Sequence, residues 1–99
     1  MNGRIGIVHA TRLSIEPLEA AFGRHWPKAP RTHLLDDSLL QDRRAAGALT
    51  PALYARIAAL ANHSYDSGAR FILFSCSAFG PAIEAARSQM DVPVLKPYE

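Results

Sequence analysis

Short apolar segments alternate along this chain with segments in which apolar residues recur every three or four positions. Residues 4–9 and 71–74 are rich in β-branched and aromatic residues, which is typical of strands. Between them, Leu53, Ile57 and Leu60 follow each other at helical spacing. Strands that alternate with helices predict a parallel sheet with right-handed crossovers and helices on both faces. We therefore expect an α/β fold with a four-stranded parallel sheet.

Capping and turn residues set the bounds of the predicted elements. Ser14 is expected to cap the first helix through its side-chain oxygen, and Gly23 and Pro27 are expected to end it. Thr50 is the expected N-cap of the longest helix. Residues 41–47 are charged and show no clear period, which predicts a connection or a short turn of helix. The predicted order, β-α-β-α-β-α-β, covers residues 4–9, 15–22, 32–35, 51–67, 71–74, 81–88 and 92–95.

The composition indicates one domain, over residues 1–99, in a reducing compartment. Of the 99 residues, 48% are hydrophobic and 20% are charged, so the chain is too apolar for disorder and too short for two ordinary domains. No run approaches the roughly 18 apolar residues of a membrane span, and residues 1–12 lack the pattern of a secretory signal. Cys76 is the only cysteine and cannot form an intrachain disulfide, so we expect a cytoplasmic protein with no membrane partner.

The charge pattern does not favour nucleic acid as a partner. The net charge is +2, and its one concentrated source is residues 24–33, where Arg24, Lys28 and Arg31 meet no acid within the segment. A surface that binds nucleic acid interleaves aromatic and basic residues, but Trp26 is the only aromatic residue here. The prolines of the segment favour a solvated loop instead.

The turns that follow the first three strands form the candidate site. In a parallel α/β sheet, ligands bind beyond the carboxyl ends of the strands, at the point where the strand order reverses. The rule selects residues 9–11, 36–38 and 75–77. Because the first and third strands are neighbours in a doubly wound sheet, we expect Thr11 and Cys76 to face one crevice.

Cys76 has the most reactive side chain in these turns. It stands between an apolar strand and the start of a helix, and a helix N-terminus stabilises a thiolate. Ser75, Ser77 and Thr11 supply hydroxyls, and the backbone N–H groups beside them can bind a carboxylate. Cys76 is therefore either a nucleophile or an acid–base group, or else an inert packed side chain.

His9 and Asp37 are weaker candidates. His9 is either a base or an oxyanion partner or, more simply, a packed and hydrogen-bonded histidine. Of Asp36 and Asp37, one is expected to act as a cap and the other to contact a ligand. No metal is expected, because the other histidines have no ligand spacing with Cys76. No nucleotide cofactor is expected either, because no glycine-rich phosphate loop follows a strand.

Four segments of the chain carry a recognisable pattern. Residues 8–11 read VHAT, residues 34–39 read LLDDSL, residues 74–81 read FSCSAFGP, and the chain closes with PVLKPYE over residues 93–99. Together they resemble the aspartate/glutamate/hydantoin racemase family, over essentially the whole chain. The resemblance does not name a substrate, since amino-acid racemases, hydantoin racemases, arylmalonate decarboxylases and maleate isomerases share this scaffold.

The resemblance implies a cofactor-independent enzyme in which two similar α/β halves face each other across a cleft. Each half supplies a cysteine: one removes the proton α to a carboxylate, and the other returns a proton to the opposite face. By this resemblance Cys76 is the acid–base group of the first half, Thr11, Ser75 and Ser77 hold the substrate carboxylate, and His9 and Asp37 line the site.

The second cysteine of such an enzyme would lie beyond Glu99. We therefore expect the N-terminal half of a racemase-type isomerase that acts on an amino acid or a hydantoin. It should be inactive alone unless a missing second half, or a second copy of the chain, completes the cleft. The alternatives are an enzyme like the arylmalonate decarboxylases or maleate isomerases, and a non-catalytic domain that binds a carboxylate or a protein.

Overall fold

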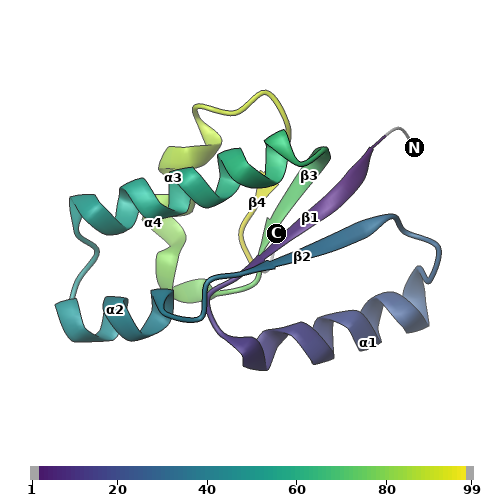
Figure 1. The fold of residues 1–99 in the computed structure, drawn as a ribbon, viewed down its shortest axis with the longest axis horizontal. Coiled ribbons are helices and arrows are strands. Elements are labelled where there is room, and N and C mark those ends of the chain that lie inside the picture. Colours follow the sequence, from purple (N-terminus) through teal and green to yellow (C-terminus); the bar gives the residue numbers. More distant parts are fainter. Residues whose placement is uncertain (1–2, 98–99) are drawn as a thin grey trace.

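The computed structural model describes residues 3–97 and contains a four-stranded parallel sheet of order β2-β1-β3-β4 (Figure 1). The sheet confirms the α/β fold, and β1 lies between β2 and β3 as a doubly wound order requires. The strands are β1 (Arg4–His9), β2 (Arg31–Leu35), β3 (Ala69–Phe74) and β4 (Val94–Leu95).

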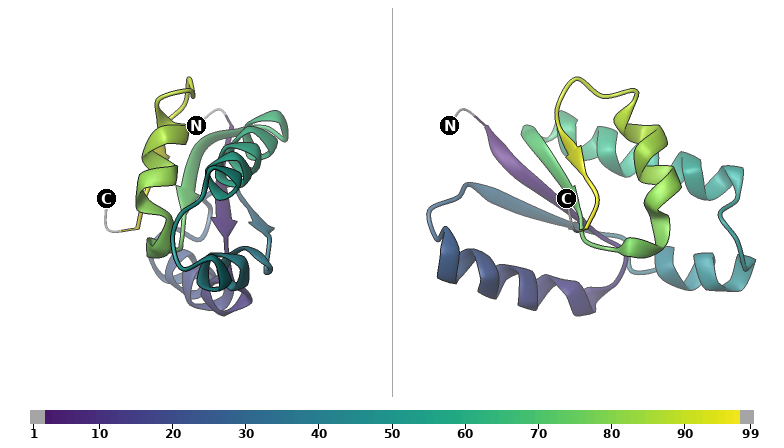
Figure 2. Two further views of the ribbon diagram at one scale, coloured as in Figure 1. Left: turned by 90° about the vertical axis from the view of Figure 1, so that its left-hand side faces the viewer. Right: turned by 180° about the vertical axis from the view of Figure 1, so that it is seen from behind.

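The helices cover both faces of the sheet, as the sequence predicts. Helix α1 (Ile15–His25) lies on one face, whereas α3 (Pro51–Asp66) and α4 (Gly80–Arg87) lie on the other (Figures 1 and 2). Two short 3-10 helices, η1 (Arg12–Ser14) and η2 (Ser77–Phe79), precede α1 and α4. None of the helices in residues 3–97 combines the length and the apolar character that crossing a membrane requires.

An additional helix lies between β2 and α3. Residues 41–47 are predicted as a connection or a short turn of helix, but residues 41–46 belong to α2 (Leu39–Ala46) and Gly47 follows it. Gly47 ends this helix with a φ of +75°, a conformation that glycine adopts without steric cost. Leu39 anchors α2 in the hydrophobic core, although most of the helix is polar and exposed. A single apolar anchor in a charged segment gives no helical period, so the pattern alone does not reveal the helix.

Helix α3 begins as the sequence predicts and carries one side of the main core. The hydroxyl of Thr50 accepts a hydrogen bond from the N–H of Leu53 at 3.2 Å, which is an N-cap. Leu53, Ile57 and Ala61 are buried against the sheet. The core between the sheet and the helices α3 and α4 also contains Val8, Ile72, Phe74, Phe79, Ile83 and Val94.

Gly6 allows α3 to lie close against β1. A Cβ atom at this position would lie 2.0 Å from the Oγ of Ser64 on α3 and 2.8 Å from the Cβ of Ala69 on β3. Both distances are far below van der Waals contact, so only glycine fits without a shift of the backbone.

The sheet face toward α1 is only partly covered. Ile7 is fully buried on this face, but Phe71 and Leu95 remain 43% and 38% exposed. A continuous apolar run such as residues 71–74 is expected of a strand that is covered on both faces, and this expectation is wrong for the α1 face of β3. The reason is topological: α1 connects β1 with β2, so it lies over that half of the sheet and leaves β3 and β4 open.

Helix α1 differs from the prediction at both ends. Ser14 stands directly before the helix, but its backbone is helical and its side chain makes no capping hydrogen bond. Its hydroxyl instead lies within hydrogen-bonding distance of His9 and Ser75. Gly23 does not end the helix, which continues to His25. A glycine in the last turn costs only about 1 kcal/mol, too little to stop a helix that packs on a sheet.

The closing segment forms the edge of the sheet. Strand β4 is limited to Val94 and Leu95, which is shorter than the predicted 92–95. The carbonyl group of Pro93 still accepts a hydrogen bond from the N–H of Ile72, at 2.9 Å. Residues 98 and 99, which complete the closing motif, lie outside the described residues.

Candidate functional site

The loops that follow β1 and β3 meet at the carboxyl edge of the sheet. The parallel register pairs Val8 with Phe74, and the N–H of Ser75 donates to the carbonyl oxygen of Val8 at 3.0 Å. Because side chains alternate along a strand, His9 and Ser75 both lie on the α1 face. The predicted proximity of the first and third strands is confirmed.

His9 is the centre of a buried hydrogen-bond network. Its ring is fully buried, and its Nδ1 atom lies 2.6 Å from Ser14 Oγ and 2.8 Å from Ser75 Oγ. Its Nε2 atom lies 2.8 Å from Nδ1 of His33 on β2, and the two rings stack. The structure thus places His9 behind the two serines, as a packed and hydrogen-bonded histidine.

The network ends at a carboxylate on α1. The Nε2 atom of His33 lies 2.6 Å from Glu19 Oε2, and Arg31 donates two hydrogen bonds of 2.8 Å to the same carboxylate. The bonds from Arg31 first, and from His33 second, lower the pKa of Glu19 from 4.5 to about 2. Glu19 is therefore ionised at neutral pH, so His33 must carry a hydrogen on Nε2.

Burial determines the charge state of His9. Burial, with a smaller effect of His33, lowers the pKa of His9 from 6.5 to about 4, so His9 is neutral at pH 7. In the arrangement in which His33 carries its hydrogen on Nε2 alone, its Nδ1 atom accepts from the Nε2–H of His9. The Nδ1 atom of His9 is then left to accept a hydrogen bond from a serine hydroxyl.

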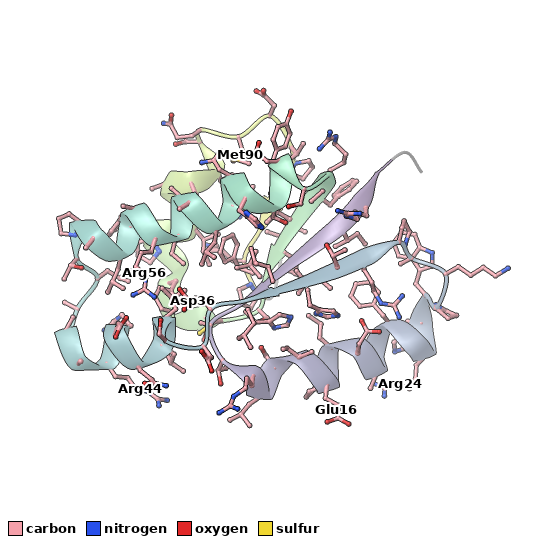
Figure 3. All side chains as sticks on the ribbon, viewed as in Figure 1. Glu16, Arg24, Asp36, Arg44, Arg56 and Met90 are labelled. Carbon is pink, nitrogen blue, oxygen red and sulfur yellow. The ribbon has the colours of Figure 1, made fainter. Side chains whose placement is uncertain are left out.

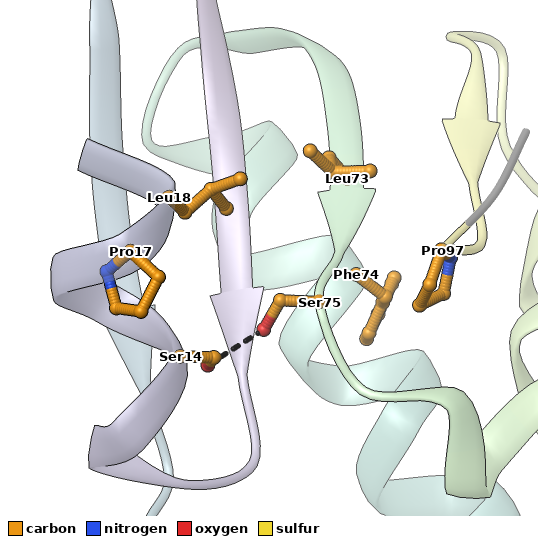
Figure 4. A pocket seen from close by; sticks show the side chains of 7 residues that line it. All are labelled: Ser14, Pro17, Leu18, Leu73, Phe74, Ser75 and Pro97. Carbon is orange, nitrogen blue, oxygen red and sulfur yellow. Dashed lines mark hydrogen bonds between the residues drawn. The ribbon is translucent and has the colours of Figure 1, made fainter. Parts of the chain in front are cut away.

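Ser14 and Ser75 line a pocket of about 400 Å³ beside this network (Figure 4). Their Oγ atoms lie 2.9 Å apart and supply its polar end. The other lining residues give it an apolar wall: Pro17, Leu18, Leu73, Phe74 and Pro97. A pocket with one polar end and an apolar wall suits a small ligand with one polar group.

Cys76 lies one residue beyond this pocket and does not line it. Its backbone is extended at the N-cap position of η2, and its half-buried side chain packs toward the main core. Ser77, the first residue of η2, is exposed. Cys76 and Ser77 therefore stand at the predicted place, after β3 and at the start of a helical segment, but neither of them lines the pocket at the serine pair.

Thr11 and Asp37 lie in the loops after β1 and β2, each in a local contact. The hydroxyl of Thr11 accepts a hydrogen bond from the N–H of Leu13 at 3.4 Å, where η1 begins. The carboxylate of Asp37 lies 3.6 Å from Nε of Arg12, and both side chains are exposed. The Arg12–Asp37 ion pair joins these two loops.

Asp36 closes the turn after β2. Its Oδ1 accepts from the N–H and the hydroxyl of Ser38, and its Oδ2 lies 2.7 Å from the guanidinium of Arg56 on α3. Figure 3 shows Asp36 and Arg56 pointing toward each other between the loop and the helix. Of the two neighbouring aspartates, Asp36 is thus the structural one and Asp37 the more accessible one.

Three members of the His9 network, Ser14, Glu19 and His33, are not among the site residues that the sequence predicts. Glu19 follows Ile15 by four positions and precedes Phe22 by three, so it lies on the apolar face of α1. A charged residue on such a face is the signal that could have pointed to a buried partner. His33 carries a weaker signal, because its position relative to β1 depends on the strand register.

A scan against protein-family models, a search of curated proteins and a search of solved structures each found no match to this chain. Within residues 3–97, no group of three or more His, Cys, Asp or Glu side chains is arranged to hold a metal ion. The fold and the site define a parallel α/β domain with a ligand-sized pocket at the carboxyl edge of its sheet.

Proposed function

We propose that this domain is one half of a cofactor-independent, racemase-type isomerase, in which Cys76 transfers the proton α to a carboxylate or carbonyl group. The observation that carries the proposal is the place of Cys76. A half-buried thiol stands at the carboxyl end of the central strand β3 and at the N-cap of η2. This is the position where open parallel sheets bind their ligands.

Neighbouring groups are suited to hold the substrate. Ser77 and Thr11 stand at the starts of the two 3-10 helices, where backbone N–H groups are available to a carboxylate. As the thiolate of Cys76 removes the α-proton, negative charge develops on the substrate oxygens, and these donors would stabilise it. The thiol then returns a proton to the same carbon. Asp37, exposed beside Arg12, is placed at the rim of this edge.

One cysteine reaches one face of the substrate. Inversion needs a second acid on the opposite face, because a single side chain cannot be aligned with both. The proposal therefore includes a partner, which is either a second half of similar fold or a second copy of this chain related by two-fold symmetry.

The uncovered sheet face favours such a partner. The pocket at Ser14 and Ser75 shares Leu73 with two further hollows of about 210 and 300 Å³, which extend along α1 to Trp26. Phe71 and Leu95 border this strip and are partly exposed. A continuous apolar strip on a small domain is typical of an interaction surface. If the strip is buried in an assembly, Phe71→Glu should shift the sedimentation coefficient toward that of the monomer.

Titration of the ¹⁵N-labelled chain with malonate, aspartate and 5-methylhydantoin tests the proposed substrate class. We expect the backbone amide signals of residues 11–14 and 75–78 to shift with at least one of these ligands and not with 1,3-propanediol, which has no carboxylate or imide. Unshifted signals at saturating ligand would contradict the proposal. Release of carbon dioxide from a 2-arylmalonate, without α-proton exchange of the other ligands, would favour a decarboxylase instead.

A further inference from the structure

The geometry points to a second reactive group at this edge of the sheet. We propose that the hydroxyl of Ser75, activated by a relay through His9, His33 and Glu19, attacks small carboxylic esters that bind in the 400 Å³ pocket. This activity does not depend on Cys76, which does not line that pocket.

In the proposed relay, each group donates its hydrogen bond to the next in the same direction, from Ser75 toward Glu19. Arg31 holds the Glu19 carboxylate in place, and this carboxylate accepts the hydrogen of His33 Nε2. In the proposed relay, His33 Nδ1 accepts from His9 Nε2, and His9 Nδ1 accepts from the hydroxyl of Ser75, which also lies 3.4 Å from the carbonyl oxygen of Val8. A hydroxyl at one end and a carboxylate at the other is the polarity that activates a serine nucleophile, here with two imidazole rings in the place of one.

The second imidazole ring, that of His33, makes it unnecessary to hold a positive charge on the buried His9. A proton held on the fully buried His9 would be unfavourable, as its pKa of about 4 indicates. When His9 Nδ1 takes the proton of Ser75, the proton on His9 Nε2 can pass over 2.8 Å to His33 Nδ1. The positive charge then lies on His33, which is 2.6 Å from the Glu19 carboxylate. The positive charge on His33 is therefore stabilised by the negative charge of the Glu19 carboxylate.

The chemical step is an ordinary acyl transfer. Ser75 Oγ bonds to the ester carbonyl carbon while its proton enters the relay. The bond from that carbon to the leaving oxygen then breaks, and the alcohol leaves with the proton that the relay returns. Water hydrolyses the acyl-serine by the same path and releases the carboxylic acid. Ser14, whose Oγ lies 2.9 Å from Ser75 Oγ, donates to the carbonyl oxygen of Thr11 at 3.2 Å and would turn this hydroxyl hydrogen to the carbonyl oxygen of the intermediate.

The pocket selects short acyl groups. Its polar end consists of the two serines, and the rest of its wall is apolar, with Pro17 and Leu18 from α1 on one side and Leu73 from β3 on the other. This wall favours acetyl or butyryl esters over charged carboxylates, which would be desolvated without a cationic partner in the pocket lining. The ester substrates of this pocket and the carboxylates proposed for Cys76 are therefore different ligands.

Labelling with diisopropyl fluorophosphate, in which the serine oxygen displaces fluoride from phosphorus, tests the nucleophile. All samples carry Cys76→Ala, so thiol reactions do not contribute. Peptide mapping should place the label on Ser75, and Ser75→Ala should abolish it, while p-nitrophenyl butyrate should be hydrolysed in parallel. A label on Ser14, a label elsewhere, or no label while circular dichroism shows a folded chain would overturn the proposal.

The relay is tested by Glu19→Gln, which keeps a hydrogen-bond acceptor for His33 but removes its charge. We expect labelling to slow by at least about tenfold, whereas Glu16→Gln, an exposed site on the same helix, should leave the rate unchanged. The imidazole ¹⁵N spectrum gives a readout that a merely structural role would not determine: both His9 and His33 should carry their hydrogen on Nε2 at pH 7.5. A hydrogen on Nδ1 of His9, or an unchanged rate in Glu19→Gln, would contradict the relay.

Discussion

His9 and His33 face each other across two neighbouring strands, with 2.8 Å between Nε2 of the first and Nδ1 of the second. The contact joins the end of the central strand β1 to the edge strand β2 beneath α1. Because Glu19 and the two serines extend it in both directions, a polar seam runs through a face of the sheet that is otherwise apolar. Buried polar networks of this kind stabilise a fold only while every member is paired, so the seam should respond to pH and to substitution.

The first expectation concerns pH. The pKa of His9 is lowered from 6.5 to about 4 in the folded chain, so between these values the unfolded chain binds a proton that the folded chain does not. The free energy of unfolding should therefore fall by about 2–3 kcal/mol as the pH is lowered from 7 to 4. Glu19, with its pKa lowered to about 2, adds a further loss below pH 4.5. Urea denaturation at pH 7.5, 5.5 and 4 measures the slope.

A matched pair of variants tests whether His9 causes this dependence of the free energy of unfolding on pH. His63→Gln, on the exposed side of α3, should keep it, whereas His9→Gln should lower stability at pH 7.5 and flatten the dependence between pH 6.5 and 4. A slope that is the same in both variants would show that His9 does not cause it.

The second expectation concerns the contact between β1 and α3. Gly6→Ala places a Cβ atom 2.0 Å from Ser64 Oγ, so it should destabilise the fold by at least about 2 kcal/mol. Gly23→Ala, in a helix position where no atom lies within 4 Å of the added Cβ, should instead gain about 0.5–1 kcal/mol. Thermal unfolding should show melting temperatures that change in opposite directions in the two variants. A change in the same direction would contradict the close contact between β1 and α3 at Gly6.

The third expectation concerns the N-cap of α3. Thr50→Ala removes the hydroxyl that accepts from Leu53 N–H and should cost about 0.5–2 kcal/mol. Thr50→Ser keeps the hydroxyl and should retain most of the stability. Equal losses in the two variants, measured by urea denaturation at pH 7.5, would mean that the cap contributes little.

The fourth expectation compares neighbours on β3 that point to opposite faces. Ile72 is fully buried in the main core, so Ile72→Ala should cost about 2–5 kcal/mol. Phe71 is 43% exposed on the α1 face, so Phe71→Ala should cost less than about 1.5 kcal/mol, although its side chain is larger. A larger loss for Phe71 at dilute concentration would indicate that its face is covered in solution, as a dimer would require.

Local patterns account for most of the fold. The strand at residues 4–9, the cap at Thr50 and the α/β alternation follow from side-chain type and spacing alone, and the structure has them where the sequence predicts. Helix α2 does not follow, because its one buried apolar residue, Leu39, leaves no period to detect. The exposure of Phe71 depends on which half of the sheet α1 covers. The apolar run at residues 71–74 does not indicate where α1 lies over the sheet.

Part of the candidate site could likewise be predicted from the sequence, and part of it could not. The strand order places the loops that contain His9 and Ser75 side by side, as the doubly wound pattern predicts. The partners of His9 could not be derived, since its contact with His33 depends on strand register, and Ser14 has the sequence features of an ordinary helix cap. The roles of Cys76, Thr11, Ser77 and Asp37 toward a substrate stay predictions, because they concern a ligand rather than the fold.

Deuterium exchange at the α-carbon of enantiomerically pure 5-methylhydantoin tests the central claim about Cys76 most directly. In D₂O, a chain shown to be monomeric by sedimentation should be inactive as a racemase, because it has no acid for the opposite face. The half-reaction at Cys76 should remain, so that one enantiomer takes up deuterium with retention of configuration. Exchange should drop to the uncatalysed rate in Cys76→Ala and continue in Glu16→Gln, a change at an exposed position on α1. Equal exchange in wild type and Cys76→Ala, or net racemisation by the verified monomer, would contradict the proposed function.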